Sequence, residues 1–162
     1  MNSLEGRTLV WLSWDEAGVF TAATRQMIND VLERKATAEQ PVKLQLIRIN
    51  AFEQVSQSVQ RQPISLITLV ICQQTEIAAA CKTFASFRGR IDQPVCVSFL
   101  RHELLENVGL LLEAGAQIVV TQLPSWQRCL PRIISRAPLT KHGFHPLTTG
   151  LLDRLPWSQI DS

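Results

Sequence analysis

The sequence predicts an α/β protein with a parallel sheet covered by helices on both faces, and three observations indicate this fold class. Residues 64–72, ISLITLVIC, form an uncharged aliphatic run, which is typical of a strand buried on both faces. Four other short apolar segments alternate with segments of helical periodicity, and this alternation favours parallel strands joined by right-handed crossovers. The chain has 162 residues, 46% of them hydrophobic, which is enough for one domain with its own core.

The amino-terminal part predicts two strands with a helix between them. Residues 8–13 form the first apolar segment and predict a strand. Residues 17–35 predict a helix, because apolar side chains recur there at three- and four-residue spacing. The expected buried stripe consists of Phe20, Ala23, Met27 and Val31. Residues 42–49 predict a second strand, and their mixed polarity suits the edge of the sheet.

One helix is expected before the aliphatic run at 64–72, and another is expected after it. Residues 52–59 predict a short helix that ends before Pro63, since the residue before a proline avoids helical geometry. Residues 76–88 predict a longer helix with Gly89 as its C-cap. The inward side chains of this helix are expected to be Ile77, Ala80, Cys81, Phe84 and Phe87.

The last strands and helices continue the alternation. Strands are expected at 95–100 and 117–121, and a helix at 103–114 between them. The inward side chains of that helix are expected to be Leu104, Val108, Leu111 and Leu112. A last helix is expected at 125–136, where Pro131 at an interior position costs about 3 kcal/mol. This helix is therefore expected either to begin late or to kink.

The sequence LEAGA at 112–116, followed by the apolar strand at 117–121, resembles the end of a response-regulator receiver domain. Residues 8–16 resemble the first strand of a receiver and its acidic turn. The resemblance implies a CheY-like, flavodoxin-like three-layer sandwich, whose five-stranded parallel sheet has the order 2-1-3-4-5. We therefore expect a receiver-like domain over residues 1–136 and an irregular, proline-containing apolar extension over 137–162.

Receivers are phosphorylated on an Asp at the end of the middle strand, and the resemblance implies where each part of that site falls. Acidic side chains hold Mg²⁺, while a hydroxyl and a Lys bind the phosphoryl oxygens. In this chain no Asp or Glu occurs from residue 64 to residue 75. The corresponding positions hold Trp14, Asp15 and Glu16 in the acidic turn, Cys72 near the nucleophile position, Phe99 at the hydroxyl position and Gln122 at the Lys position. The resemblance thus implies a pseudo-receiver that lacks the phosphoacceptor Asp and the Lys and is not an enzyme.

Three sets of reactive side chains leave alternatives open. Asp15 and Glu16 could hold a cation, but two adjacent carboxylates more often cap a helix start. Cys72 could be a nucleophile, but the sequence places no base beside it, so a buried thiol is favoured. His142 and His145 have the spacing of a metal pair without further ligands nearby. We expect neither a metal nor a cofactor.

A protein partner or self-association is the expected mode of action. In receivers, partners dock on the face formed by the fourth helix, the fifth strand and the fifth helix. The residues expected to contact a partner there are Arg101, His102, Gln117, Trp126 and Arg128. Trp126 is either an exposed hot spot on this face or part of the core. Leu152 and Trp157 in the extension either fold back onto the domain or bind a partner or a second copy.

Composition narrows the function further. The net charge is +2 and the basic residues are scattered, so a nucleic-acid interface is not expected. The sequence begins without a signal-peptide layout and has no apolar run near 18 residues, so we expect a cytoplasmic protein that does not enter a membrane. We expect a non-phosphorylated interaction domain of a bacterial signalling system. The alternative is a small-ligand sensor that uses the uncharged cleft at the carboxyl ends of the strands.

Overall fold

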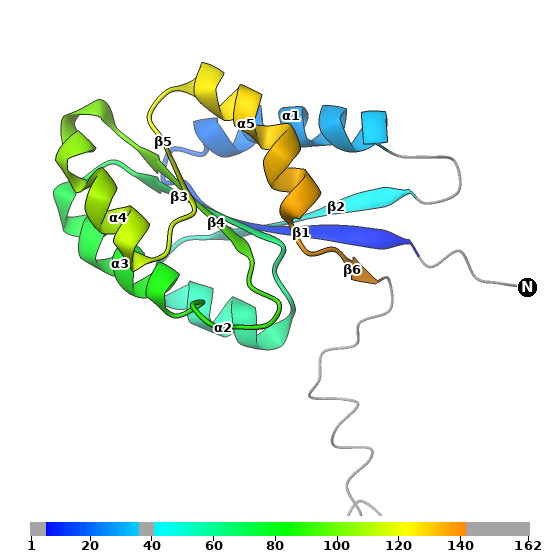
Figure 1. Ribbon diagram of the computed structural model, residues 1–162, viewed down its shortest axis with the longest axis horizontal. Helices are drawn as coiled ribbons and strands as arrows, with labels where there is room; N and C mark the ends of the chain where they lie inside the picture. Colours follow the sequence, from blue (N-terminus) through cyan, green and yellow to red (C-terminus); the bar gives the residue numbers. More distant parts are fainter. Residues whose placement is uncertain (1–5, 36–40, 142–162) are drawn as a thin grey trace, which may run out of the picture.

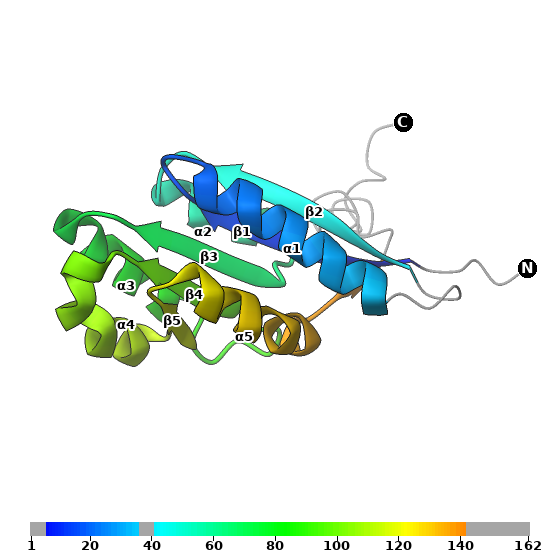
Figure 2. The ribbon, with the colours of Figure 1, turned by 90° about the horizontal axis from the view of Figure 1, so that it is seen from above.

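The computed structural model describes residues 6–35 and 41–141. Its central feature is a sheet of five parallel strands in the order β2-β1-β3-β4-β5, as predicted. The strands are β1 (Arg7–Trp14), β2 (Val42–Ile49), β3 (Leu66–Ile71), β4 (Val95–Leu100) and β5 (Ile118–Val120). Helices α1 and α5 cover one face, and α2, α3 and α4 cover the other, which confirms the three-layer sandwich (Figures 1 and 2).

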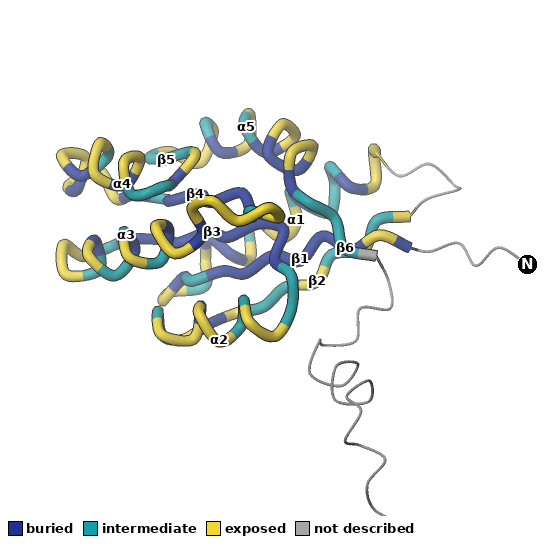
Figure 3. The backbone as a smooth tube through the Cα atoms, turned by 60° about the horizontal axis from the view of Figure 1, so that its bottom comes forward, coloured by how far each residue is buried: buried dark blue, intermediate teal, exposed yellow. Residues whose placement is uncertain are grey.

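The helices and the short sixth strand are bounded as follows: α1 (Val19–Lys35), α2 (Glu53–Arg61), 3-10 helix η1 (Gln74–Glu76), α3 (Ile77–Ala85), 3-10 helix η2 (His102–Asn107), α4 (Val108–Ala114), α5 (Leu123–Arg136) and β6 (Thr140–Lys141). Every residue of β3 is buried, as expected for a middle strand (Figure 3). Strand β2 lies at an edge, which agrees with its mixed polarity.

Helix α1 buries Phe20 as predicted, but the rest of its buried stripe differs from the predicted one. Its buried residues are Phe20, Thr21, Thr24, Ile28 and Leu32. Met27 and Val31 are only half-buried at the margin of the contact. The reason is that the sheet under α1 is partly polar: the hydroxyls of Ser13 and Thr21 lie 2.9 Å apart and hydrogen-bond. A stripe drawn through apolar side chains alone misses such a contact.

The helices after β3 and β4 are shorter than predicted. Helix α3 ends at Ala85, so Gly89 is not its C-cap; Gly89 lies in the following turn with φ of +75°. The segment predicted as one helix at 103–114 begins as η2 and becomes α-helical only at Val108. Leu112, predicted to point inward, is 44% exposed, whereas Leu111 is fully buried.

Helix α5 begins earlier than predicted, at Leu123, with Pro124 in its first turn, where a proline ring suits helical geometry. Pro131 lies inside the helix and is exposed, so its ring faces solvent rather than the sheet. The Ser135 hydroxyl donates to the Pro131 carbonyl at 2.8 Å. The predicted late start is therefore wrong, because the helix accepts this proline on its outer side.

The sheet continues past the predicted domain boundary at residue 136. Strand β3 pairs with β1 only from Trp11 onward, which leaves the amino half of β1 open on that side. Strand β6 fills this position and pairs antiparallel with Arg7 and Thr8. Ala137, just after α5, is buried. Residues 137–141 thus belong to the packed structure, and the rest of the extension lies outside the described residues.

Among the described residues, no helix is both long enough and apolar enough to cross a membrane.

Candidate functional site

The carboxyl ends of the middle strands carry uncharged side chains. Val70 of β3 is paired with Phe99 of β4, which is paired with Val120 of β5. On the other side of β3, Leu69 is paired with Trp14 of β1. In open parallel sheets this edge is where ligands and reactive groups are commonly placed. We call Val70, Phe99 and Val120 the strand-end row; these residues, like Leu69 and Trp14, carry neither a carboxylate nor a hydroxyl group.

Phe99 and Trp14 both pack against helices. The Phe99 ring lies 4.7 Å from that of Phe20 at the start of α1. Trp14 packs on Phe52, with ring centroids 4.9 Å apart, and its indole nitrogen has no hydrogen-bond partner within the described part of the chain. Ser98, next to Phe99, has a fully buried hydroxyl, also without a partner there. Trp14 and Phe99 are thus both held in aromatic packing contacts.

Asp15 caps helix α1. Its side chain is 9% exposed and accepts a hydrogen bond of 2.9 Å from the backbone N–H of Thr21. Its carbonyl also accepts the N–H of Gly18 at 3.2 Å. The capping alternative therefore accounts for this carboxylate, which also favours the positive end of the helix. Glu16 is exposed to solvent.

A carboxylate does reach the end of β3, from a residue that the sequence analysis did not single out. Glu76 folds back so that its Oε2 accepts the backbone N–H groups of Cys72, at 2.8 Å, and Gln73, at 3.0 Å. Gln73 and Glu76 form a capping box, and their three-residue spacing is a signal that could have revealed this contact. The carboxylate is engaged with two donors, so it stabilises the turn after β3.

Cys72 has a less reactive thiol than an ordinary cysteine. Burial, together with the negative charge of Glu76, raises the pKa of the Cys72 thiol. The carboxylates of Asp15 and Glu16 act in the same direction, while Arg101 opposes them. A raised pKa leaves little thiolate at neutral pH, so this environment disfavours nucleophilic chemistry.

Across residues 6–35 and 41–141, no three His, Cys, Asp or Glu side chains are grouped so that they could hold a metal ion. His142 and His145 lie outside the described residues, so the metal-pair alternative stays untested.

Four of the five domain residues expected to contact a partner are exposed: Arg101, His102, Gln117 and Arg128. Arg101 also forms an ion pair of 3.4 Å with Glu103. Gln122, at the Lys position of the resemblance, is exposed and precedes α5, where its carbonyl accepts the Trp126 N–H at 3.2 Å.

Trp126 is not on this face, and its assignment to a partner contact is wrong. The side chain is fully buried, and its Nε1 donates to the Thr24 hydroxyl at 2.9 Å. It packs between α5 and α1, with its ring 5.7 Å from that of Phe20. The core alternative is therefore the one that the structure supports. Leu152 and Trp157 lie outside the described residues.

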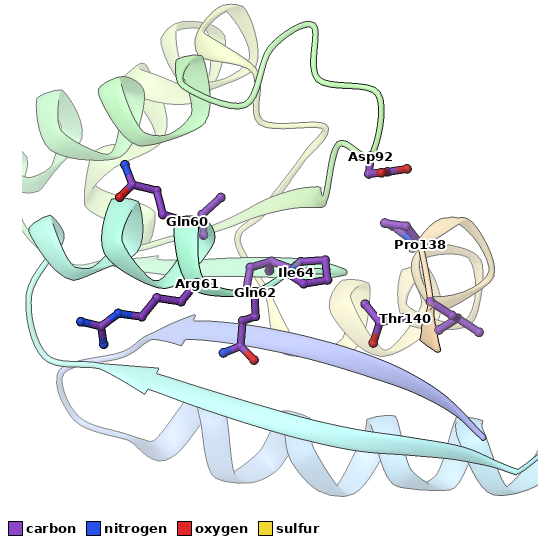
Figure 4. Close-up of a pocket in the computed structure, with 10 residues that line it drawn as sticks. Gln60, Arg61, Gln62, Ile64, Asp92, Pro138 and Thr140 are labelled. Atoms are coloured by element: carbon purple, nitrogen blue, oxygen red, sulfur yellow. The ribbon is translucent and has the colours of Figure 1, made fainter. Parts of the chain in front are cut away.

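Three cavities of about 480, 440 and 460 Å³ lie toward the amino ends of the strands. The largest is enclosed by the end of α2, the connection to β3, Asp92 and the segment before β6 (Figure 4). None of these three is lined by Trp14, Cys72, Phe99 or Gln122.

The architecture defined above, five parallel strands in the order 2-1-3-4-5 between two helical layers, is that of response-regulator receivers. A response regulator from Thermotoga maritima has a similar structure, with a TM-score of 0.54 at 14% sequence identity, covering 79% of this chain and 98% of that one. A response regulator in red light signaling of R. palustris gives a TM-score of 0.44 at 12% identity, covering 82% and 97% of the two chains. No family model matches the sequence, and no curated protein matches it.

Proposed function

We propose that this chain is a receiver-like protein–protein interaction domain of a bacterial signalling system that works without being phosphorylated. The observation that carries the proposal is the uncharged strand-end row of Val70, Phe99 and Val120. A phosphoryl acceptor there needs a free carboxylate beside a Mg²⁺ site. Asp15 and Glu76, two carboxylates that follow β1 and β3, each already accept backbone N–H groups.

The phosphorylation half of the proposal is tested by intact-mass spectrometry. The full chain is incubated with acetyl phosphate and Mg²⁺, with a response regulator that has the usual Asp as a positive control. We expect the control to gain the mass of one phosphoryl group and this chain to gain none. A gain of that mass, mapped to Asp15 or Glu76, would contradict the proposal.

The partner half rests on exposed apolar side chains around the edge strand β5. Six large apolar side chains are exposed among the described residues, and four of them lie between residues 105 and 123. These four are Leu105, Leu110, Leu112 and Leu123. They belong to η2, α4 and the start of α5. Arg101 directly precedes η2, and Arg128 lies within α5. Exposed apolar surface can mark a protein contact, and arginine is enriched at protein interfaces.

Affinity capture with charge-reversal variants tests this surface. Arg101→Glu and Arg128→Glu are expected to lose a captured partner, because both reverse a charge at the contact. Arg25→Glu, at an exposed position of α1, is the matched control and is expected to retain the partner. Equal capture by all three variants would place the contact elsewhere.

A further inference from the structure

The largest of the three cavities described above is one end of a longer, mainly apolar groove at the amino ends of the strands. The cavities of about 480 and 440 Å³ share Val59, Pro63, Ile64 and Asp92 as lining residues, so they adjoin one another. The first cavity extends to the segment that leads into β6, and the second extends to Ile91. We call the two together the α2 groove. Figure 4 shows its first half, with Ile64 at the centre and Pro138 and Thr140 on the opposite wall.

The α2 groove presents apolar surface that the described part of the chain leaves uncovered. Val59, Pro63 and Leu139 are only half-buried, and Ile91 is fully exposed at the far end. Such exposed aliphatic surface around a concave site favours the binding of an apolar segment.

The rim of the groove carries charges of both signs. Arg61 and Asp92 line the first cavity, and Arg90 lines the second beside Asp92. Within residues 6–35 and 41–141, none of these three forms an ion pair. Arg90 instead lies over the ring of Phe87, 5.2 Å from its centroid. The rim can therefore pair with a segment that carries one acid and one base.

The last described residues of the chain lie at the wall of this groove. Thr140 lines the first cavity, and Lys141 is the last described residue. Residues 151–157 have the sequence LLDRLPW, in which Asp153 and Arg154 lie between large apolar side chains. The ten residues from 142 to 151 span up to about 33 Å when extended, which is enough to return to a groove that begins beside Thr140.

We propose that residues 151–157 bind in the α2 groove of their own chain. Leu152 and Trp157 occupy the apolar floor, while Asp153 faces the rim arginines and Arg154 faces Asp92. A short tether gives the segment a millimolar effective concentration at the groove, so even modest contacts hold it. This inference goes beyond the proposed function, since the partner surface around β5 uses none of these groove residues.

Trypsin cleavage of the full chain after Arg154, followed by mass spectrometry, tests the proposal. Arg154 lies inside the binding segment, so docking protects it. Two variants release the segment: Ile91→Asp in the groove and Trp157→Ala in the segment itself. Each is expected to raise the rate of cleavage after Arg154 by at least about tenfold, because each removes one large apolar contact and cleavage tracks the undocked population. Val19→Asp, at another exposed aliphatic position, is the matched control and is expected to leave the rate unchanged.

The fully exposed Ile91 supports no other part of the fold, so its substitution leaves the domain intact, which near-ultraviolet circular dichroism verifies. Equal cleavage rates in the wild type and in all three variants overturn the proposal. Protection that disappears on dilution shows that the segment binds a second copy, and this also overturns binding within one chain. Protection that is independent of concentration and is lost only in the two release variants supports it.

Discussion

The indole Nε1 of Trp126 donates a hydrogen bond of 2.9 Å to the hydroxyl of Thr24, and both side chains are fully buried. This contact joins α5 to α1 across the upper helical layer of Figure 1. It removes a large aromatic side chain from the surface where a partner contact was expected. Trp126 is therefore part of the structural core that holds the last helix in place.

The Trp126–Thr24 hydrogen bond is expected to contribute measurably to stability. Thr24→Val keeps the volume of the side chain but leaves the buried indole N–H without an acceptor, which costs roughly 1–3 kcal/mol. Thr24→Ser is the matched control, because it retains the hydroxyl. Urea denaturation should show the larger loss in free energy of unfolding for the valine variant. If the valine variant is no less stable than the serine variant, the hydrogen bond contributes little to the stability of the fold.

The capping box after β3 predicts a change in thiol reactivity. Burial and then the charge of Glu76 raise the pKa of the Cys72 thiol. Glu76→Gln removes the charge while leaving an oxygen that can accept the same two N–H groups, so the pKa of Cys72 should fall. We expect faster alkylation of Cys72 by iodoacetamide at pH 8, measured by peptide mass spectrometry.

Cys81 provides the internal reference for that experiment. Its pKa is raised by burial alone, without a contribution from Glu76. Its alkylation rate should therefore be the same in the wild type and in Glu76→Gln. If both cysteines react faster, the substitution has loosened the structure, and the electrostatic explanation fails.

The parallel sheet and its alternating helices were predictable, because they depend on local patterns that repeat along the chain, whereas the strand order was implied by the resemblance to receiver domains. The uncharged run at 64–72 indicated a strand buried on both faces, and β3 is the middle strand with every residue buried. The strand Val95–Leu100 was predicted with its observed bounds. Patterns of this kind are read within a few residues and need no knowledge of distant contacts.

The parts that the sequence did not reveal depend on contacts between distant residues. The burial of Trp126 depends on a threonine 102 positions away. The inward stripe of α1 shifts because a polar pair, Ser13 and Thr21, lies inside the sheet interface. At the candidate site, the missing acid was visible in the sequence, whereas the return of Glu76 to the end of β3 required the turn geometry.

Residues 137–141 are expected to stabilise the domain. A chain that ends at Arg136 loses the buried Ala137, the pairing of β6 with β1, and the hydrogen bond of 3.2 Å from the Thr140 hydroxyl to the Thr8 carbonyl. Compared with a chain that ends at Lys141, it should lose roughly 1–3 kcal/mol of unfolding free energy. Urea denaturation of the two shortened chains measures the difference. Equal stability would show that β6 contributes little to the sheet.

Cys96 predicts how stability changes at alkaline pH. The side chain is fully buried in β4, and burial raises the pKa of its thiol to about 12. The unfolded chain ionises this thiol at about pH 8.5, so its contribution to stability is complete below that pH and is lost as the pH rises toward the folded value. At pH 10 the loss should be roughly 2 kcal/mol. The chain contains no Tyr, so phenol ionisation does not interfere in this range.

The Cys96→Ala variant isolates this effect. The substitution lowers stability at every pH because it leaves a small cavity, but it removes the ionisable group. The difference in unfolding free energy between wild type and variant should therefore shrink between pH 8 and pH 10. Cys72 and Cys81 are present in both proteins, so their own titration cancels in the comparison. A difference that stays constant with pH would mean that the Cys96 thiol ionises equally in the folded and unfolded states, and it would contradict the raised pKa.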